Sequence, residues 1–258
     1  MQGYEKFKEQ IFKKTGLDLS LYKERQMKRR IESLIKRNHI DTYEEYYKLI
    51  NTNKDSFDEF VNYLTINVSE FYRNESQWKI LQEEILPEIL KKKKRIKIWS
   101  AACSTGEEPY TLAMVLSNLM PLSQIKILAV DIDKEAIQKA KMGVYSKKSI
   151  ENVPPAIKSK YFREVASSFA ISDEIKKCVE FKHMNLLKDK YPSDCDLIVC
   201  RNVMIYFTEE AKDEMYHNFN GALVEGGVLF VGSTEQIILP NRYNFNAKKT
   251  FFYERKAK

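Results

Sequence analysis

Small and acidic residues follow a predicted strand near the middle of the chain. The strand, Ile96–Ala102, leads through Cys103 into Ser104-Thr105-Gly106-Glu107-Glu108, after which a helical pattern begins. Small residues after a first strand let a ligand approach the backbone, as in nucleotide-type cofactor loops, although Gly106 alone matches GxGxxG poorly. Glu107 and Glu108 would repel a pyrophosphate. A cationic or zwitterionic ligand fits better, and S-adenosylmethionine carries a sulfonium and an ammonium.

Asp131 is the second candidate ligand residue. It ends the next predicted strand, Ile125–Asp131, and lies 25 residues after Gly106. A carboxylate at that place can accept hydrogen bonds from both hydroxyls of a ribose. A helix cap is an equally good interpretation, because Asp131 or Asp133 precedes a predicted helix, Lys134–Met142.

A polar pair follows a later strand. Arg201 and Asn202 come directly after the predicted strand Leu197–Cys200. Ligands in open α/β sheets bind at the carboxyl ends of the strands, so these two side chains lie where a ligand is expected.

The elements that must position these residues begin with a helical region. The first 65 residues contain no Pro and several helical periods, which predict a small all-α domain. Its helices are expected at Tyr4–Thr15, Leu21–Arg37, Thr42–Ile50 and Ser56–Ile66. A further helix, Ser76–Leu90, is predicted in a linker region at 66–94, and cations at Lys91–Arg95 end it.

From residue 95 to 258, strand-like and helical segments alternate, as a parallel α/β sheet requires. Further elements are a helix at Tyr110–Leu119, strands at Val179–His183 and Val228–Gly232, a helix end and tight turn at Leu223–Gly227, and a last, antiparallel strand at Thr250–Arg255. The alternation breaks between Gly143 and Lys177, where a β-favouring stretch, Ser167–Ser172, predicts a small β insertion at about 144–178. The predicted fold class is α/β, a Rossmann-like sheet with a small N-terminal all-α domain.

One predicted helix carries most of the net charge. The chain has 43 Lys and Arg against 36 Asp and Glu, and seven of the bases but two of the acids lie between Lys23 and Arg37. At 100° per residue, the apolar side chains of this helix share one face, and Arg25, Arg29 and Lys36 fall opposite. Such a stripe is most often a solvated face, but it can also dock an acidic protein or nucleic acid.

Composition excludes several classes of protein. The 258 residues are 43% hydrophobic and 31% charged, which is typical of a globular protein with a real core. No apolar run approaches the roughly 18 to 20 residues of a membrane span, and the charged N-terminus lacks a signal core, so we expect a cytoplasmic protein with no membrane insertion. The four cysteines form no CxxC pair, and no metal site is expected.

Five stretches taken together resemble a known family. They are LTINVSEFYR from Leu64, IWSAACSTGEEPYTLAM from Ile98, VDID from Val130, FKHMNLL from Phe181 and CRNVMIYF from Cys200. They look like the chemotaxis receptor methyltransferases of the CheR type over nearly the whole chain. The resemblance implies a class I methyltransferase sheet and methyl transfer from S-adenosyl-L-methionine to glutamates on the cytoplasmic helices of chemoreceptors, with S-adenosyl-L-homocysteine as product.

The resemblance also implies roles for individual residues. In that family the segment between the domains closes over the cofactor, which adds Asn67, Ser69 and Arg73 to the site, with Ser69 replacing a commoner Thr. By the same resemblance, Arg73 and Tyr206 lie near the sulfonium and the incoming carboxylate as catalytic residues. The remaining implied contacts are Ala101 and Glu108 on the methionine side, Asp131 on the ribose, Asn185 and Leu186 on the adenine, and Asn202 and Val203 on the floor. From pattern alone, Asn67 reads as a helix cap and Arg73 as a solvated side chain.

Substrate and partners follow in the same way. A glutamate with a pKa of about 4.3 is ionised at neutral pH, so the reaction needs positioning and desolvation more than a general base. A glutamate-rich substrate favours docking on Arg25, Lys28, Arg29 and Lys36, and makes a chemoreceptor the expected partner of a monomer that binds no nucleic acid. The alternatives are an S-adenosylmethionine-dependent RNA methyltransferase, suggested by the charge of +7, and a non-catalytic receptor-binding module.

The insertion bears on one further partner. Some members of the family add a C-terminal pentapeptide tether of the receptor as a strand to a small β-subdomain with a glycine-rich loop. Phe162–Lys177 contains no glycine, which argues against tether binding.

Overall fold

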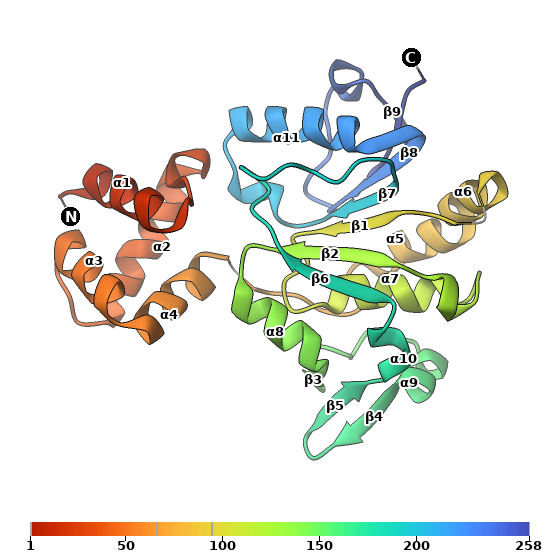
Figure 1. Cartoon of the computed structure of the whole chain (residues 1–258), viewed down its shortest axis with the longest axis horizontal. Coiled ribbons are helices and arrows are strands. Elements are labelled where there is room, and N and C mark those ends of the chain that lie inside the picture. The colour runs from red at the N-terminus through yellow and green to blue at the C-terminus, as the bar shows by residue number, and fades with distance from the viewer. Residues whose placement is uncertain (1, 66, 94, 258) are drawn as a thin grey trace. The chain divides into compact units, whose positions relative to one another are not determined.

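The computed structural model describes residues 2–65, 67–93 and 95–257 (Figure 1). Met1, Ile66, Lys94 and Lys258, where several predicted boundaries fall, lie outside the described residues. The chain divides into two compact units, one of Met1–Asn67 with Val203–Met215 and the other of Val68–Asn202 with Tyr216–Lys258.

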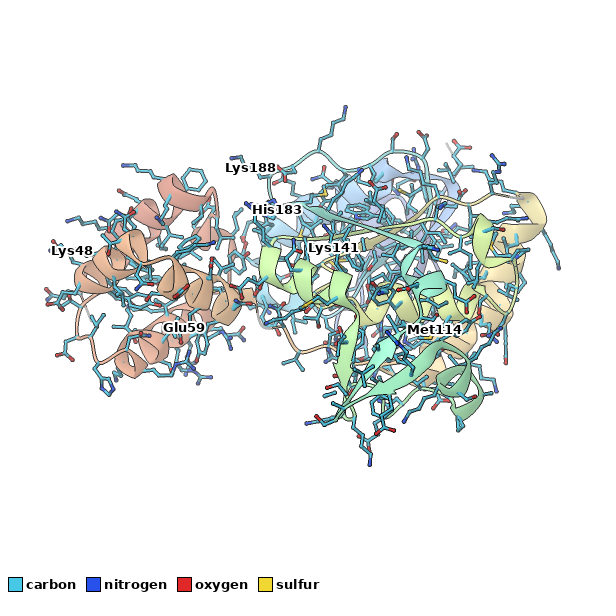
Figure 2. The ribbon with its side chains drawn as sticks, turned by 60° about the horizontal axis from the view of Figure 1, so that its bottom comes forward. Lys48, Glu59, Met114, Lys141, His183 and Lys188 are labelled. Carbon is cyan, nitrogen blue, oxygen red and sulfur yellow. The ribbon has the colours of Figure 1, made fainter. Side chains whose placement is uncertain are left out.

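The first unit is helical. Its helices are α1 (Tyr4–Thr15), α2 (Glu24–Arg37), α3 (Tyr43–Thr52) and α4 (Lys54–Thr65), with a 3-10 turn at Leu19–Leu21. Phe7 packs against Tyr43 and Phe60 at ring distances of 5.2 and 5.9 Å. Arg37 of α2 pairs with Glu59 of α4, labelled in Figure 2, at 2.6 Å. Aromatic packing therefore gives this small unit its own core, and the exposed ion pair joins two of its helices at the surface.

The basic helix begins later than predicted. Residues 21–23 were expected to be helical, but Asp18 caps the turn at Leu19–Leu21 and Tyr22 is extended at φ −101°. Tyr22 forms a bridge with Phe207, so the chain is drawn out of helical geometry before α2 starts. The apolar face of α2 is buried as the helical period predicted, through Met27, Ile31, Leu34 and Ile35.

The second unit is a seven-stranded sheet in the order β6-β2-β1-β7-β8-β10-β9. The strands are β1 (Ile98–Ala101), β2 (Ile127–Asp131), β6 (Val179–His183), β7 (Cys195–Cys200), β8 (Leu223–Val231), β9 (Phe245–Lys249) and β10 (Phe252–Arg255). Neighbours run parallel from β6 to β8, and β10 is antiparallel to both β8 and β9. Helices cover both faces, with α7 (Glu107–Leu116) and α8 (Lys134–Met142) on one side and, on the other, the part of α11 (Glu209–Ala222) that belongs to this unit from Tyr216 onward (Figure 1).

The predicted insertion is a small antiparallel sheet in the order β3-β5-β4. Its strands are β3 (Val144–Ser146), β4 (Phe162–Val165) and β5 (Ser168–Ile171), with short helices α9 (Pro155–Tyr161) and α10 (Asp173–Lys176). Gly143 ends α8 at φ 67° and lets the chain turn directly into β3.

Two details of the second unit differ from expectation. The helix predicted at Ser76–Leu90 is α5 (Glu75–Ile80) and α6 (Leu86–Lys92) joined by a π-helical turn, Leu81–Ile85, before Pro87, which has no amide hydrogen for a regular helix. Leu223, expected in a helix end, already belongs to β8. The register of β8 on β7 jumps from Leu223 to Val228, and Gly226 at φ 73° permits the bulge.

Candidate functional site

Strand ends of the second unit meet at one edge of the sheet. Ala101, Asp131, Cys200 and Val231 are the last residues of β1, β2, β7 and β8, and all four strands run parallel. Parallel strands bring their carboxyl ends to the same edge, which is where open α/β sheets bind ligands. The predicted residues Ala101, Glu108, Asp131 and Asn202 therefore gather there.

The loop after β1 is bent into an unusual shape. Ala102, Ser104 and Gly106 have φ values of 61°, 48° and 94°, a region in which only glycine is unstrained. A side chain on Gly106 would meet the Ala140 methyl at 2.8 Å, and the Tyr145 hydroxyl donates to the Thr105 carbonyl at 2.8 Å. The loop thus packs closely on α8 and β3, and its backbone is fixed before any ligand binds.

Asp131 holds this loop and does not cap the next helix. Its Oδ2 accepts from the Ser104 N–H at 2.7 Å, and its Oδ1 accepts from the Asp133 N–H at 2.9 Å. Asp133 is the cap of α8, accepting from the N–H groups of Glu135 and Ala136. A carboxylate has about four acceptor positions, so Asp131 keeps capacity for a ligand hydroxyl. Burial raises the pKa of Asp131 to about 6, while the surrounding amides lower it.

Glu108 is a second, largely buried acid at the same edge, with its side chain 12% exposed. Its Oε1 accepts from the Ser100 hydroxyl at 2.9 Å, and its Oε2 lies 3.9 Å from Arg201 Nη1. Burial raises the pKa of Glu108 to about 7, although the Arg201 charge and the Ser100 hydroxyl oppose the rise. Glu107 beside it is buried too, and bonds to the Thr105 hydroxyl at 2.6 Å and to the Ser69 hydroxyl. Both acids have raised pKa values, so a cationic ligand beside them would favour their ionised forms.

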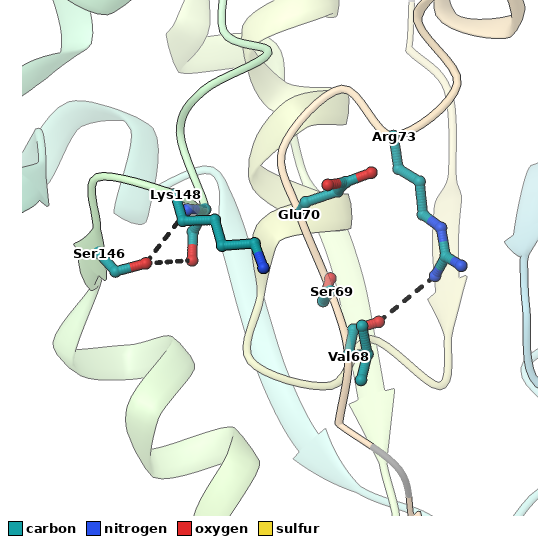
Figure 3. Close-up of a pocket in the computed structure, with 7 residues that line it drawn as sticks. Val68, Ser69, Glu70, Arg73, Ser146 and Lys148 are labelled. Atoms are coloured by element: carbon teal, nitrogen blue, oxygen red, sulfur yellow. Dashed lines mark hydrogen bonds between the residues drawn. The ribbon is translucent and has the colours of Figure 1, made fainter.

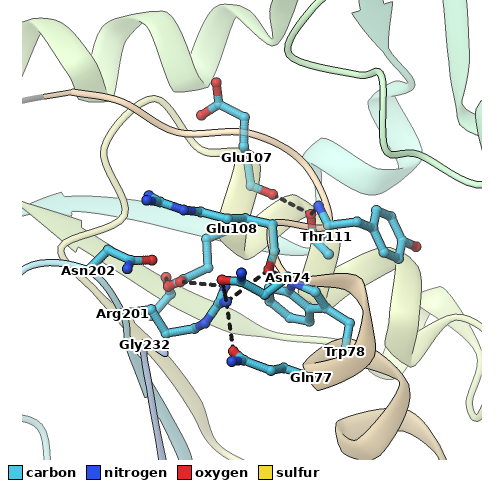
Figure 4. A network of polar contacts seen from close by, with 12 residues as sticks. Asn74, Gln77, Trp78, Glu107, Glu108, Thr111, Arg201, Asn202 and Gly232 are labelled. Atoms are coloured by element: carbon cyan, nitrogen blue, oxygen red, sulfur yellow. Dashed lines mark hydrogen bonds and ion pairs between the residues drawn. The ribbon is translucent and has the colours of Figure 1, made fainter. Parts of the chain in front are cut away.

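Arg201 is the centre of a buried network (Figure 4). Its Nη2 donates to the Arg73 carbonyl at 2.8 Å, to Asn74 Oδ1 at 3.1 Å and to Gln77 Oε1 at 2.9 Å. Its guanidinium lies 5.2 Å from the Trp78 ring and 4.8 Å from the Phe230 ring. Arg201 was placed at the strand end by sequence, but its structural role there was not foreseen.

The network fixes the backbone at Arg73 and leaves its side chain outside. The Trp78 indole also donates to the Arg73 carbonyl, at 3.0 Å, and the Tyr72 N–H donates to the Thr111 hydroxyl at 3.2 Å. The guanidinium itself donates to the Val68 carbonyl at 3.3 Å, in an exposed position. It lines a pocket of about 180 Å³ together with Ser69, Glu70 and Lys148 (Figure 3).

Asn202 follows Arg201 in a left-handed conformation with φ 61°. Its N–H donates to Glu235 Oε2 at 2.6 Å, and the Gly232 N–H donates to the same oxygen at 2.9 Å. Glu235 is 5% exposed and was not singled out from the sequence. It bonds to Asn202, 33 residues earlier, and to Gly232, three residues earlier. No local sequence pattern predicts this pair of bonds.

The predicted adenine residues follow β6, the strand beside β2. Asn185 Oδ1 accepts from the Leu187 N–H at 2.9 Å, and the Asn185 N–H donates to Asp189 Oδ2 at 2.8 Å. Leu186 is buried. The Met184 N–H donates to the Asp131 carbonyl at 2.9 Å, which ties this turn to the end of β2.

Three predicted residues belong to the first unit. Asn67 Nδ2 donates to the Thr65 hydroxyl at 3.1 Å. Val203 precedes the 3-10 turn Met204–Tyr206, and the Tyr206 N–H donates to the Val203 carbonyl. The Tyr206 carbonyl accepts from the Lys23 N–H at 2.9 Å. Their roles toward a ligand remain predictions.

The predicted docking residues also lie in the first unit, on α2. Arg25, Arg29 and Lys36 are exposed. Lys28 is half-buried, with its ammonium 5.4 Å from the Tyr4 ring. Lys28 is therefore partly engaged within the unit, and the other three present the stripe to solvent.

The described residues, 2–65, 67–93 and 95–257, lack two kinds of feature. Within these ranges no three His, Cys, Asp or Glu side chains are grouped as metal ligands. No helix in the same ranges has the length and apolarity needed to span a bilayer.

Comparison with known proteins decides the family. Residues 67–252 match the family model described as CheR methyltransferase, SAM binding domain, and residues 2–65 match CheR methyltransferase, all-alpha domain. The chain belongs to the CheR methyltransferase family. Chemotaxis protein methyltransferases from Listeria monocytogenes and Listeria innocua are 41% and 40% identical over 92% of this chain and 91% of their own. The Escherichia coli chemotaxis protein methyltransferase is 30% identical over 87% of this chain and 81% of its own.

One solved structure illustrates the level of structural similarity. PKMT2 from Rickettsia typhi has a TM-score of 0.34 and 19% identity, over 53% of this chain and 20% of its own, which adds nothing to the family match. The family fixes the cofactor as S-adenosylmethionine. The donor set fits it, because the acids Glu107 and Glu108 would suit a cationic ligand and the carboxylate of Asp131 would accept from ribose hydroxyls.

Proposed function

We propose that this CheR methyltransferase esterifies glutamate side chains on the cytoplasmic helices of chemoreceptors, in sensory adaptation, and so works in the cytoplasm. The names of its relatives support a role in chemotaxis. The observation that carries the choice of a carboxylate substrate is Arg73, whose backbone is locked by Arg201 and Trp78 while its guanidinium lines an open pocket. A guanidinium held in this way is suited to orient a carboxylate through charge-assisted hydrogen bonds.

Different residues of the second unit bind the cofactor and orient the substrate. Bound S-adenosylmethionine supplies an electrophilic methyl group. Glu108 faces its positive charge and Asp131 its ribose hydroxyls, and Asn202, Asn185 and Leu186 complete the proposed cofactor wall. Arg73 orients the glutamate carboxylate for in-line attack on the methyl carbon, as the bond from that carbon to sulfur breaks. The substrate is already ionised at neutral pH, so no group on the chain needs to remove a proton.

The test is methyl transfer with a chemically diagnostic product. The protein is incubated with methyl-labelled S-adenosylmethionine and either a receptor cytoplasmic fragment, the same fragment with its candidate glutamates changed to glutamine, or total RNA, and the products are treated with alkali. We expect label on the first fragment alone, released as methanol because methyl esters hydrolyse in alkali. Alkali-stable label, or label on RNA, would contradict the proposal. RNA is included as a substrate because the exposed basic stripe on α2 could also bind nucleic acid phosphates.

A further inference from the structure

The pocket beside Arg73 has a second cationic wall. Lys148, in the turn after β3, lines the same pocket of about 180 Å³, and Figure 3 shows it approaching from the side opposite Arg73, with Ser69 and Glu70 between them. This volume is well above the minimum that one water molecule needs, and it is enough to admit the head of an acidic side chain. The two cations outnumber the single acid, Glu70, so the pocket favours an anion.

The walls of this pocket are built and do not depend on a ligand. The Phe71 N–H donates to the Ser149 carbonyl at 3.0 Å, and the Phe71 ring packs edge-on against Tyr145 at 4.8 Å. These contacts join the segment that carries Arg73 to the turn that carries Lys148. The hydroxyls of Ser146 and Ser149 share one hydrogen bond at 3.0 Å, so one hydroxyl hydrogen remains to donate to an acceptor in the pocket.

The Lys148 side chain is available to a ligand, judged from the part of the chain that the structure describes. Its ammonium is exposed and has no ion pair or hydrogen bond with a described residue. We propose that Lys148, on the wall opposite Arg73, binds an acidic side chain of the substrate segment other than the one that Arg73 orients for methylation. The proposal rests on the proposed function, because it assigns to that substrate a second point of recognition.

The test is a kinetic comparison on the receptor fragment. For Lys148→Ala we expect the KM for the fragment to rise about three- to tenfold at low salt, with kcat and S-adenosylhomocysteine affinity unchanged, and Lys148→Glu should raise KM further. Lys148→Arg should stay within about twofold of the wild type. Lys147→Ala is the matched control, because Lys147 is an exposed neighbour that does not line the pocket.

Two results would overturn this assignment. One is wild-type KM in Lys148→Ala, and the other is an equal rise in Lys147→Ala, which would mean that only general charge matters. A wild-type enzyme that forms no alkali-labile ester on the fragment instead defeats the proposed function itself, so the two failures are distinguishable.

A second inference comes from a different place, the turn after β8. Glu235 joins the two strand ends of β7 and β8 through one oxygen, which accepts from both the Asn202 and Gly232 N–H groups. A side chain on Gly232 would collide with the Glu235 carboxylate and lie 2.8 Å from the Asn202 nitrogen. The glycine is needed because the carboxylate and the two backbones approach each other so closely.

We infer that Glu235 is a positioning residue that holds Asn202 in its left-handed conformation for the cofactor. Asparagine tolerates a φ of 61° better than most residues, and a buried acceptor for its N–H selects this conformation over the extended one. The inference rests on the proposed cofactor role of Asn202. Glu235 acts on the cofactor only through that residue.

The variants Glu235→Asp and Glu235→Gln distinguish the effect of the length of the Glu235 side chain from the effect of its charge. Neither variant opens a large cavity. The Gln variant keeps the reach and an acceptor oxygen, whereas the Asp variant keeps the charge and is one methylene too short. By calorimetric titration with S-adenosylhomocysteine, we expect Glu235→Asp to weaken binding about tenfold and Glu235→Gln to remain within about threefold. Wild-type affinity in Glu235→Asp, or equal loss in both variants, would overturn the inference; Asn202→Ala with wild-type affinity would defeat its premise separately.

Discussion

The two units use arginine in opposite ways. Arg201, in the methyltransferase unit, is 7% exposed and contacts two aromatic rings, three oxygens of residues 73–77 and the carboxylate of Glu108. Arg25 and Arg29, in the helical unit, stand in solvent on α2. One arginine is part of the structure of a site, and the other two are available to a partner.

The difference shows that burial, more than charge, decides what an arginine does. Removing one member of a buried charge network leaves its partners without hydrogen bonds, at a cost of about 3 to 5 kcal/mol. An exposed pair contributes about 0 to 1 kcal/mol and is screened by salt. Substitutions of the buried and the exposed arginines should therefore have different effects on stability, cofactor affinity and substrate binding.

Stability should show the largest contrast. Arg201→Ala is expected to lower the free energy of unfolding by about 3 to 5 kcal/mol, because the Arg73 carbonyl, Gln77 and Glu108 lose a buried donor. Urea denaturation measures this loss of free energy of unfolding. Arg25→Ala is the exposed control, and its loss should be less than about 0.5 kcal/mol. Equal losses in the two variants would remove the distinction between the arginines.

Arg73 lies between these extremes, because its backbone is held by buried contacts and its guanidinium is exposed at the pocket. We expect Arg73→Ala to lower kcat about a hundredfold while the melting temperature stays near that of the wild type, because the buried contacts belong to its carbonyl. Turnover and thermal unfolding are measured on the same preparation. A melting temperature that falls along with activity would make Arg73 structural, like Arg201.

Substitution of Asp131 tests the proposed contact of an acidic residue with the cofactor ribose. Asp131→Ala should weaken cofactor binding by about 1 to 3 kcal/mol, through lost bonds to ribose and a loosened Ser104 amide. Calorimetry with S-adenosylhomocysteine reads the loss. Asp173→Ala, at an exposed position in the insertion, is the control, and unchanged affinity in Asp131→Ala would refute the ribose assignment.

Buried acids also predict a pH dependence that exposed bases do not. Glu108 has a raised pKa of about 7, so at pH 6 only about a tenth of the free protein carries its charge. An ammonium-bearing ligand binds the ionised form better, and affinity should therefore rise up to about tenfold between pH 6 and pH 8. Glu108→Gln should flatten this profile, and a wild-type profile that is flat or falls with pH would contradict the assignment.

The stripe on α2 should give the smallest effect per residue. The double reversal Arg25→Glu and Arg29→Glu is expected to raise the KM for the receptor fragment several-fold and leave S-adenosylhomocysteine affinity unchanged, because like charges then repel receptor glutamates. Lys54→Glu with Lys13→Glu, on other exposed positions of the helical unit, matches the change in charge. Equal loss in both pairs would reduce the stripe to a solvated face.

Features with a local signature could be predicted from the sequence. Met27, Ile31, Leu34 and Ile35 repeat with the helical period, and their burial on α2 follows. Asp131 ends a strand, and its place at the sheet edge follows from strand order. The fold class rests on this alternation of strands and helices, and the sheet confirms it.

Features set by distant partners were missed. Asp131 and Asp133 were equal candidates for the helix cap, and only the hydrogen bonds show that Asp133 is the cap. The sequence gives no sign that Glu235 bonds to Asn202 across 33 residues. Strand β9 was not predicted because it alternates weakly, with polar side chains in most of its positions, and it is defined by pairing with β10.

A salt series tests the central claim most directly. On one preparation, the KM for the receptor fragment and the affinity for S-adenosylhomocysteine are measured from about 0.05 to 0.5 M NaCl, where the screening length falls from about 14 to 4 Å. If exposed arginines capture the substrate and buried charges hold the cofactor, KM rises several-fold and cofactor affinity stays within about twofold. A KM that does not change with salt, or a cofactor affinity that falls in parallel with substrate capture, would contradict this division of labour.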